Sequence, residues 1–343
     1  MAVSVAFVYA NPRHRLQAEV AAGNAPDTGL LGLNHLAGLG VDARLVEPRI
    51  RGGNRLAWHA RELVLPFDLR TFDVVCSPLA NYLPRALALA RGPSSIVLNY
   101  GLSAILERGS RARRRLLLAS LRASRFVVCF SRSQRERLLA DALDPERVSV
   151  LPLGVDDRFF LPSEVPTGGP IVAVGRDLAR DYGTFARAVD GLRRTSVVVA
   201  SERNLEGVAL PDAVEVRRDV PYEELRRLYA AASCVVVPTY GDEYPFGADC
   251  SGQTVLLDAM ASGRPVVVTR RSYVDDYVED GRTALLVPPG DPEALRDAIT
   301  RVLEDHDLAS RVGASARSEI ERRFTTRSFA ERLAPVISVA AST

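Results

Sequence analysis

The sequence contains no lysine, and arginine supplies all 44 of its basic side chains. The codon bias of a GC-rich genome explains this choice without any functional reason. The absence still excludes one kind of chemistry, because no coenzyme can be attached covalently to a lysine amine of this chain. Any phosphate that the chain binds through cationic side chains must be bound by guanidinium groups, whose planar fork suits phosphate oxygens.

Cysteines and metal-binding patterns are also scarce. The four cysteines (Cys76, Cys129, Cys234 and Cys250) are scattered, and none has the spacing of a metal or redox site. No Asp-x-Asp pair follows a strand-like run where a divalent metal would be expected. No G-x-G-x-x-G follows the first such run, which argues against an NAD-dependent oxidoreductase. We expect a reduced cytoplasmic protein that uses no metal and no cofactor.

Long apolar runs are absent as well. No run approaches the roughly 20 residues that a membrane-spanning helix requires. The first ten residues, MAVSVAFVYA, lack the basic start of a signal peptide and are typical of a first strand. A composition of 47% hydrophobic and 25% charged residues indicates a globular chain, and 343 residues suit two domains.

The charge is unevenly distributed although its sum is only +2. Residues 1–165 carry 22 Arg against 15 acidic residues, and the remainder carries 22 Arg against 27. The run from Arg108 to Arg125 contains seven Arg and could present a basic amphipathic face to an anionic membrane surface or an acidic acceptor. The alternative is a helix packed by its leucines with a solvated arginine face. We expect no nucleic-acid partner.

Short Val/Ile/Leu-rich runs alternate with amphipathic stretches along the whole chain. Runs without polar alternation indicate strands buried on both faces, as in a parallel sheet covered by helices. The predicted strands are Val3–Tyr9, Ala43–Val46, Val74–Cys76, Ser95–Leu98, Phe126–Phe130, Val148–Leu151, Ile171–Val174, Ser196–Ala200, Val214–Val216, Cys234–Pro238, Pro265–Thr269 and Ala284–Val287. The predicted helices are Leu30–Leu39, Pro84–Ala90, Gln134–Ala142, Gly183–Leu192, Tyr222–Ala232, Thr254–Ala261, Pro292–Glu304, Leu308–Phe324 and Thr326–Val339.

This alternation predicts an α/β protein of two Rossmann-like, doubly wound domains. The segment Pro152–Pro170 is rich in Pro and Gly and separates the two arrays, so we place the domains at 1–165 and 166–325. The last helix, within 326–343, is expected to pack back on the first domain. Two such domains facing each other would leave a cleft at the carboxyl ends of their strands, where ligands of these folds bind.

Two segments of the second half are suited to a diphosphate. Gly175 follows a predicted strand and leads into Arg176 and Arg180, two guanidinium groups four residues apart. The other segment, Cys250-Ser251-Gly252-Gln253-Thr254, opens an apolar helix in which Ser251 is a natural N-cap and Gly252 lets a ligand approach the backbone. The start of such a helix favours anions, and Asp258 follows about one turn later. The alternatives are two solvated arginines and an ordinary capped helix.

From about Thr28 to Phe324 the chain resembles the family-4 retaining glycosyltransferases of the GT-B fold. The resemblance implies that the chain transfers a sugar from a nucleotide-diphosphate donor to an acceptor hydroxyl, without metal. It implies a donor site in the second domain and an acceptor site in the first. The matching segments are FSRSQRERLLADALDPERVSVLPLGVDDRFF (130–160), VAVGRDLARDYGTFARAV (172–189), YEELRRLYAAASCVVVPT (222–239), LLDAMASGRPVVVT (256–269) and YVEDGRTALLVPPGDPEALRDAI (277–299).

The resemblance also implies roles for single residues. Arg176 and Arg180 would hold the leaving diphosphate and serve as the catalytic residues, with Arg180 at a position that is more often Lys. The backbone from Ser251 to Thr254 would contact the phosphates, beside Gly175. Asp258 stands where the family has the second Glu of its E-x7-E motif and would bind the donor ribose.

Several positions depart from the family pattern. The first Glu of the motif falls at Cys250, and Asp249 is the nearest carboxylate; Glu243 could belong to a displaced copy of the missing element. Asn99 stands on the acceptor side where members often have His, and asparagine cannot act as a general base. The usual Gly-Gly after the first strand is reduced to Gly29. A nucleotide-sugar epimerase and a catalytically inactive nucleotide-sugar-binding protein remain the alternative functions, whereas a phosphorylase would need a coenzyme-bearing lysine.

Overall fold

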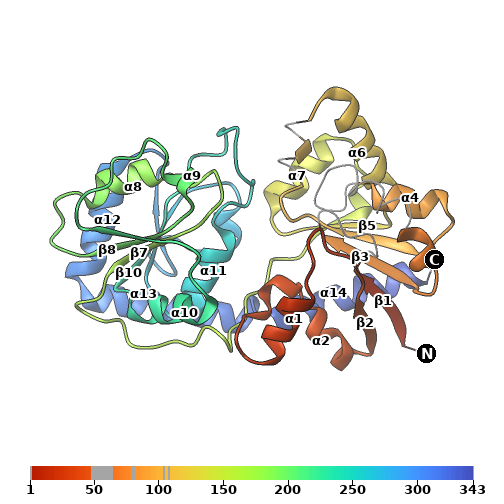
Figure 1. Cartoon of the computed structure of the whole chain (residues 1–343), viewed down its shortest axis with the longest axis horizontal. Helices are drawn as coiled ribbons and strands as arrows, with labels where there is room; N and C mark the ends of the chain where they lie inside the picture. Colours follow the sequence, from red (N-terminus) through yellow and green to blue (C-terminus); the bar gives the residue numbers. More distant parts are fainter. Residues whose placement is uncertain (1, 48–64, 79–81, 103–104, 107–108, 343) are drawn as a thin grey trace. The chain divides into compact units, whose positions relative to one another are not determined.

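The structure is a computed structural model that describes residues 2–47, 65–78, 82–102, 105–106 and 109–342. Its contacts divide the chain into two compact units (Figure 1). The first unit comprises Met1–Glu19, Asp27–Leu153 and Thr326–Thr343, and the second comprises Val20–Pro26 and Gly154–Thr325.

The first unit is built on a six-stranded sheet of order β2-β1-β3-β4-β5-β6, in which every neighbouring pair is parallel. Strand β3 is buried at all five positions, as expected of a sheet covered on both faces. The strands are β1 (Val3–Phe7), β2 (Val41–Leu45), β3 (Val74–Pro78), β4 (Ser94–Leu98), β5 (Phe126–Cys129) and β6 (Val148–Val150). The described helices are α1 (His14–Ala21), α2 (Leu33–Leu36), α4 (Leu83–Leu89), α6 (Arg111–Ala123), α7 (Arg132–Ala140) and α14 (Thr326–Ala341), with short 3₁₀ turns η1 (Asp27–Leu30), η2 (Ala37–Leu39) and η3 (Pro145–Arg147).

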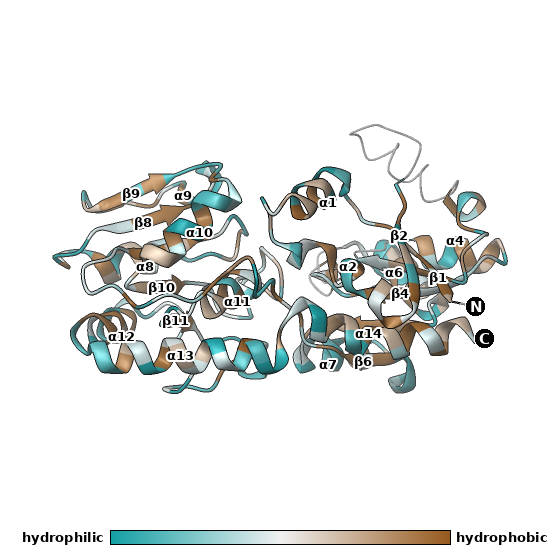
Figure 2. Ribbon diagram, turned by 90° about the horizontal axis from the view of Figure 1, so that it is seen from below, coloured by the Kyte–Doolittle hydropathy of each residue, from teal (hydrophilic) through white to brown (hydrophobic). Residues whose placement is uncertain are grey.

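The second unit repeats this plan with a parallel sheet of order β12-β11-β10-β7-β8-β9. Helix α12 buries Leu295, Ala298, Ile299 and Val302, the spacing of one helix face, and in Figure 2 the helices α12 and α13 accordingly carry both hydrophobic and hydrophilic colours. The strands are β7 (Ile171–Val174), β8 (Ser196–Val199), β9 (Val214–Arg217), β10 (Cys234–Val237), β11 (Val266–Thr269) and β12 (Leu285–Val287). The helices are α8 (Tyr182–Val189), α9 (Glu202–Leu205), α10 (Tyr222–Ala231), α11 (Gln253–Ala261), α12 (Pro292–Glu304) and α13 (His306–Arg323), with the 3₁₀ turn η4 (Val274–Asp276).

All twelve predicted strands are present within two residues at each end, but one predicted helix is wrong. Leu30–Leu39 is not a continuous helix: it is divided among η1, α2 and η2. The break falls where Leu31 and Gly32 both have positive φ, 49° and 81°, a backbone conformation that ends a right-handed helix.

The division between the units lies before the predicted boundary at 165. Residues 154–165 belong to the second unit because they bond to its other segments. The Val155 amide donates to the Phe324 carbonyl at 2.8 Å, and Arg264 donates to the Glu164 carbonyl at 3.0 Å. Helix α14 returns to the first unit, where it packs on α2 and on strands β1, β3 and β4.

Candidate functional site

The loop that follows β7 carries the first group of candidate residues. Asp177 organises this loop: one carboxylate oxygen accepts from the Ala179 amide and the other from the Ala248 amide, each at 2.9 Å. The Asp177 carbonyl accepts from the Asn204 side chain at 2.8 Å. Gly175 has a φ of 153°, and a Cβ there would collide with the Arg180 guanidinium. The backbone is therefore shaped so that the Arg180 side chain folds back over Gly175.

Arg180 is almost completely buried, at 4% exposure. Its Nε and Nη1 atoms have no hydrogen-bond partner, and no carboxylate of the described residues forms an ion pair with it. A buried cation without a counter-charge is costly, by several kcal/mol when no acceptor replaces water. This guanidinium therefore has the properties of one half of an ion pair whose anion arrives with a ligand.

Arg176 lies in a different environment from Arg180, although the sequence suggested an equivalent pair. Its side chain is about half exposed, at 52%, and its Nη2 lies 3.0 Å from the Asp219 carboxylate. Contact with a ligand phosphate would require Arg176 to exchange that partner. Of the two arginines, only Arg180 offers buried N–H groups without an acceptor.

The start of helix α11 lies against Arg180. Gly252 is the N-cap, with a left-handed φ of 93°, so the prediction that Ser251 caps the helix is wrong. A Cβ at Gly252 would lie 2.7 Å from Val237 and 3.2 Å from both Arg180 Nη1 and the Tyr273 hydroxyl. The chain can pass between these groups only without a side chain at this position.

The first turn of α11 contains further polar atoms without partners. The Ser251 hydroxyl and both side-chain amide atoms of Gln253 are buried and make no hydrogen bond with the residues that the structure describes. The Gln253 backbone amide donates to the Cys250 carbonyl at 3.1 Å, so that amide is not available to an anion. Thr254 occupies the same turn. Buried polar atoms are satisfied in nearly all native structures, so this cluster of unsatisfied ones is a candidate ligand site.

Asp258 and Asp249, two carboxylates that the sequence predicts as site residues, also lie near the start of α11. Asp258, one turn into α11, is 6% exposed and its Oδ1 has no partner. Burial, assisted by the charge of Asp156, raises the pKa of Asp258 well above its ordinary value. Asp249 accepts from the Cys250 amide at 3.0 Å through Oδ1, while its buried Oδ2 is unpartnered. Burial raises the pKa of the Cys250 thiol, so Cys250 remains uncharged at neutral pH.

The remaining candidates lie elsewhere in the chain. Glu243 is exposed in the loop between β10 and α11. In the first unit, Asn99 is fully buried after β4 and accepts from the Leu102 amide at 2.9 Å, which holds the following turn. Gly29 lies in η1, where a Cβ would meet Leu16 at 2.9 Å. His35 contacts Asp27 at 2.8 Å and Thr326 at 3.1 Å, as expected of a structural histidine.

The sequence analysis missed Arg271 and Tyr273. Arg271 follows β11 and is 4% exposed; its Nε donates to Asp242 at 3.1 Å and its Nη1 is buried without a partner. The Tyr273 hydroxyl donates to the Ser251 carbonyl at 2.8 Å. The sequence could have indicated both residues. Strands β7, β10 and β11 are neighbours, so polar side chains that follow β11 lie at the same edge of the sheet as those that follow β7 and β10.

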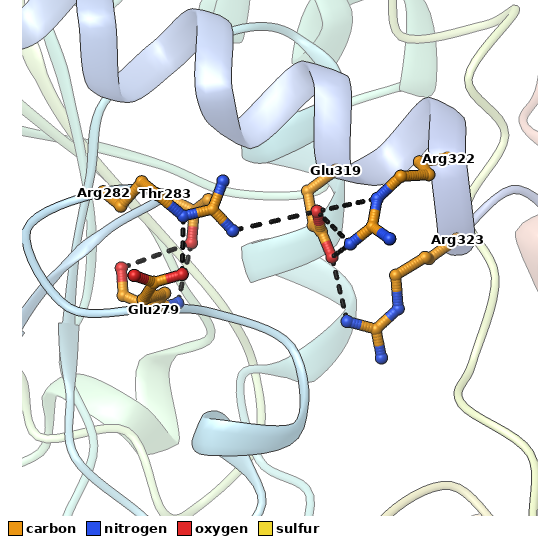
Figure 3. Close-up of polar contacts among 6 residues, drawn as sticks. All are labelled: Glu279, Arg282, Thr283, Glu319, Arg322 and Arg323. Carbon is orange, nitrogen blue, oxygen red and sulfur yellow. Dashed lines mark hydrogen bonds and ion pairs between the residues drawn. The ribbon is translucent and has the colours of Figure 1, made fainter.

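A second charged cluster in this unit is held together by ion pairs among its own members (Figure 3). Glu319 on α13 accepts from Arg322 at 2.6 Å and from Arg323 at 2.9 Å, and Arg282 lies 3.9 Å away. Burial acts to raise the pKa of Glu319, but the two hydrogen-bonded guanidinium groups outweigh it and hold the pKa below its ordinary value. Arg282 also donates to Glu279 of its own loop at 2.5 Å, and its ion pair with Glu319 connects this loop, which precedes β12, to α13. This cluster stabilises the fold rather than offering an open charge.

In the part of the chain that the structure describes, no group of three or more His, Cys, Asp or Glu side chains is arranged to hold a metal ion. No helix among the same residues combines the length and apolar character needed to cross a membrane.

Comparisons with protein families match both halves of the chain. Residues 4–159 match the model described as Glycosyltransferase Family 4, and residues 170–305 match the model described as Glycosyl transferases group 1. The chain is 27% identical over 225 residues to the MMP alpha-(1->4)-mannosyltransferase of Mycolicibacterium hassiacum, a match that covers 61% of this chain and 53% of that protein. It is 35% identical over 211 residues to the D-inositol 3-phosphate glycosyltransferase of Nocardioides sp., covering 50% and 44%. The chain thus spans about half the length of these curated relatives.

Solved structures match almost the whole chain. HepE from Anabaena, in complex with UDP and glucose, superposes with a TM-score of 0.72 at 14% identity, covering 98% of this chain and 100% of that one. Sucrose-phosphate synthase from Thermosynechococcus elongatus gives a TM-score of 0.76 at 18% identity, covering 99% and 100%. At these identities the likeness concerns the fold.

Proposed function

This chain belongs to glycosyltransferase family 4 and has the GT-B fold, and on that basis we propose that it transfers a sugar from a nucleoside-diphosphate donor to an acceptor hydroxyl. The observation that carries the proposal is Arg180, a buried guanidinium with two unpartnered nitrogens beside the start of α11. The second unit would bind the donor, and the first unit would bind the acceptor.

The chemistry of the leaving group explains this arrangement. Negative charge grows on the diphosphate as the glycosidic bond breaks, and a donor group already fixed in place stabilises that charge without reorganising. The Arg180 guanidinium and the positive end of α11 would provide such stabilisation. Arg176 would join them once it leaves Asp219. We propose a retaining transfer, in which the departing phosphate oxygen accepts the acceptor proton, so that Asn99 need not act as a base.

We predict that the protein binds a nucleoside diphosphate equally well with and without divalent metal, because guanidinium groups take the place of a metal at the phosphates. Isothermal titration calorimetry with UDP, GDP and ADP, in EDTA and then in Mg²⁺ or Mn²⁺, measures this. Binding that requires the metal would contradict the proposed metal-independent site.

Asp258→Asn should weaken nucleotide binding by about 1.5–3 kcal/mol, the usual contribution of a hydrogen bond to a charged acceptor. Asp249→Asn, the matched control, should have a smaller effect, because Asp249 already accepts from the Cys250 amide. If ribose hydroxyls donate to ionised Asp258, affinity should rise with pH as that group loses its proton, and the Asp258→Asn variant should lose this dependence. Calorimetry over a pH series tests both points; equal binding by both variants would remove Asp258 from the ribose site.

Asp258→Asn should stabilise the unliganded protein, although it should weaken nucleotide binding. A carboxyl group whose folded-state pKa lies above its unfolded value contributes stability at low pH and loses it as pH rises through the folded pKa. Asp258→Asn removes that loss, so the variant should melt at a higher temperature than the wild type at neutral pH. A lower melting temperature would show that Asp258 supports the fold.

A catalytically inactive nucleotide-sugar-binding protein is the second candidate, favoured by the buried, uncharged thiol of Cys250 at a carboxylate position of the family motif. An epimerase would act on the donor without an acceptor. Product analysis distinguishes the three: transfer yields a glycosylated acceptor, epimerisation yields an altered donor, and a binding protein yields neither.

We also propose that the first unit contacts anionic membranes through α6. This helix buries Leu117, Leu118 and Leu121 and leaves residues 111–116 exposed, including four arginines and Leu116 at 51% exposure. Arg114 is paired with Asp141, whereas Arg108, the start of the predicted basic run, lies outside the described residues.

Reversing the charge of Arg111, Arg113 and Arg115 to Glu should reduce binding to phosphatidylglycerol vesicles by at least about tenfold, at about 1 kcal/mol for each arginine near the surface. Vesicle co-sedimentation at two salt concentrations measures this, with neutral phosphatidylcholine vesicles as the control. Unchanged binding by the triple variant would support the alternative that the arginines of α6 form only a solvated face.

A further inference from the structure

Arg271 is a buried cation to which the proposed function assigns no role. It stands two residues after β11, whose residues Val266–Val268 pair in register with Val235–Val237 of β10. Parallel pairing brings the loop after β11 beside the loop that leads into α11. Arg271 therefore lies in a loop on the side of β10 opposite to β7.

The contacts of Arg271 hold it firmly in place. Asp242 accepts from Arg271 Nε at 3.1 Å through one oxygen and from the Ser272 amide at 2.8 Å through the other. The Arg271 side chain is 3% exposed, whereas the Asp242 side chain is 33% exposed. The buried Nη1 has no partner, so Asp242 satisfies only part of this guanidinium.

The Tyr273 side chain interacts electrostatically with both Arg271 and Arg180. Burial raises the pKa of the Tyr273 phenol, and the charges of Arg271 and Arg180 both oppose that rise, so both guanidinium groups lie near its hydroxyl. That hydroxyl is bonded to the Ser251 carbonyl, and a Cβ at Gly252 would lie 3.2 Å from it and from Arg180 Nη1. The side-chain-free position at Gly252 thus lies between Arg180 and the Tyr273 hydroxyl, and the charge of Arg271 also acts on that hydroxyl.

The acidic residues nearby do not satisfy the unpartnered guanidinium nitrogens. Asp177 uses its two oxygens on backbone amides, and Asp242 bonds to Arg271 Nε but not to Nη1. Asp249 has one buried oxygen without a partner, which is suited to a sugar hydroxyl. Unpartnered donors and an unpartnered acceptor in one place match a ligand that carries both phosphate oxygens and hydroxyl groups.

We infer that Arg271 binds the β-phosphate of the donor and, together with Arg180, forms the pair of cations that holds the leaving diphosphate. This inference rests on the proposed function and adds a residue from a third strand end, β11, to a site assigned to β7 and α11. Arg271 is then a binding residue for the leaving group, and Asp242 is its positioning residue.

The test compares nucleoside diphosphates with monophosphates, because only the diphosphate has a β-phosphate. UDP, GDP and ADP are titrated into the wild type, and the best binder and its monophosphate are titrated into each variant. Arg271→Gln should lower affinity for the diphosphate by about tenfold or more, as expected for a lost charge-assisted contact, and affinity for the monophosphate by less than about threefold. The neighbouring Arg270→Gln is the matched control, because Arg270 is half exposed and pairs with Asp275 and Asp280.

Two further variants separate phosphate binding from a structural role. Asp242→Asn removes the ion pair but keeps the guanidinium, so it should bind the diphosphate better than Arg271→Gln does. Arg271→Lys keeps the charge and should bind with intermediate affinity, which tests the inference even if Arg271→Gln fails to fold. Equal losses for monophosphate and diphosphate, or a loss in Asp242→Asn as large as in Arg271→Gln, would overturn it.

The same titrations distinguish failure of the proposed function from failure of the inference about Arg271. If the wild type binds no nucleoside diphosphate, both proposals are wrong. If the wild type binds one and Arg180→Ala abolishes that binding while Arg271→Gln leaves it unchanged, only the inference about Arg271 is wrong.

Discussion

Replacing Arg180 with alanine should lower turnover by about 10²–10³-fold, as removal of a preorganised donor to a developing anion does in other enzymes. Arg180 has buried nitrogens without acceptors beside Gly252, so a phosphate bound there would gain contacts already in place. The loss in turnover should exceed the loss in affinity for the diphosphate, because the leaving group carries more charge in the transition state than in the ground state.

The loss of turnover in Arg180→Ala can be compared with that in Arg176→Ala. Arg176→Ala should lower turnover less than Arg180→Ala, because Arg176 is half exposed and already paired with Asp219. Arg193→Ala, at an exposed position after α8, should leave turnover unchanged. Initial rates with a verified donor and acceptor measure all three variants.

The stability of the Arg180→Ala variant provides a second readout. Removing a buried cation that has no counter-charge relieves a desolvation penalty, so the melting temperature of the unliganded protein should not fall. A normally folded Arg180→Ala protein with near-normal turnover would exclude Arg180 from the mechanism.

Replacing Arg264 with alanine should lower the free energy of unfolding by about 3–5 kcal/mol, the range for breaking a buried polar network. Arg264 is completely buried, and its guanidinium donates to the carbonyls of Ser163, Glu164, Ala230, Ala232 and Ser262. Burial lowers its pKa to about 10, so it stays protonated at neutral pH. The substitution would leave five backbone acceptors without their donor and a cavity in place of the side chain.

Urea unfolding followed by circular dichroism measures this effect. Arg296→Ala is the matched control, because the partly buried Arg296 donates to a single carbonyl among the described residues, that of Arg187, at 3.0 Å. The control should change stability by no more than about 0.5 kcal/mol, as most surface substitutions do. A change below about 1 kcal/mol for Arg264→Ala would show that water replaces the guanidinium at these carbonyls.

Some features of the candidate site are visible in the sequence and others are not. Gly175 and Gly252 mark the two places where backbone must pass close to other groups, and both have the positive φ that glycine tolerates. The N-cap was assigned to Ser251 because serine commonly caps helices, but the left-handed turn at Gly252 moves the cap by one residue. The sequence also did not show that Arg180 is buried whereas Arg176 is half exposed, since each is an arginine after a strand.

The sequence by itself determined the order of strands and helices, because the periodicity of apolar residues is a local property that survives without knowledge of the fold. It also indicated the family and the loops that carry the proposed donor site. Only the tertiary structure decided which charges are satisfied. Arg271 meets Asp242 across 29 residues of chain, and Arg180 meets no carboxylate although acidic residues flank it at Asp177 and Asp181. The reason is physical: an exposed charge is stabilised by water wherever it stands in the sequence, whereas a buried charge depends on whichever distant segments pack around it.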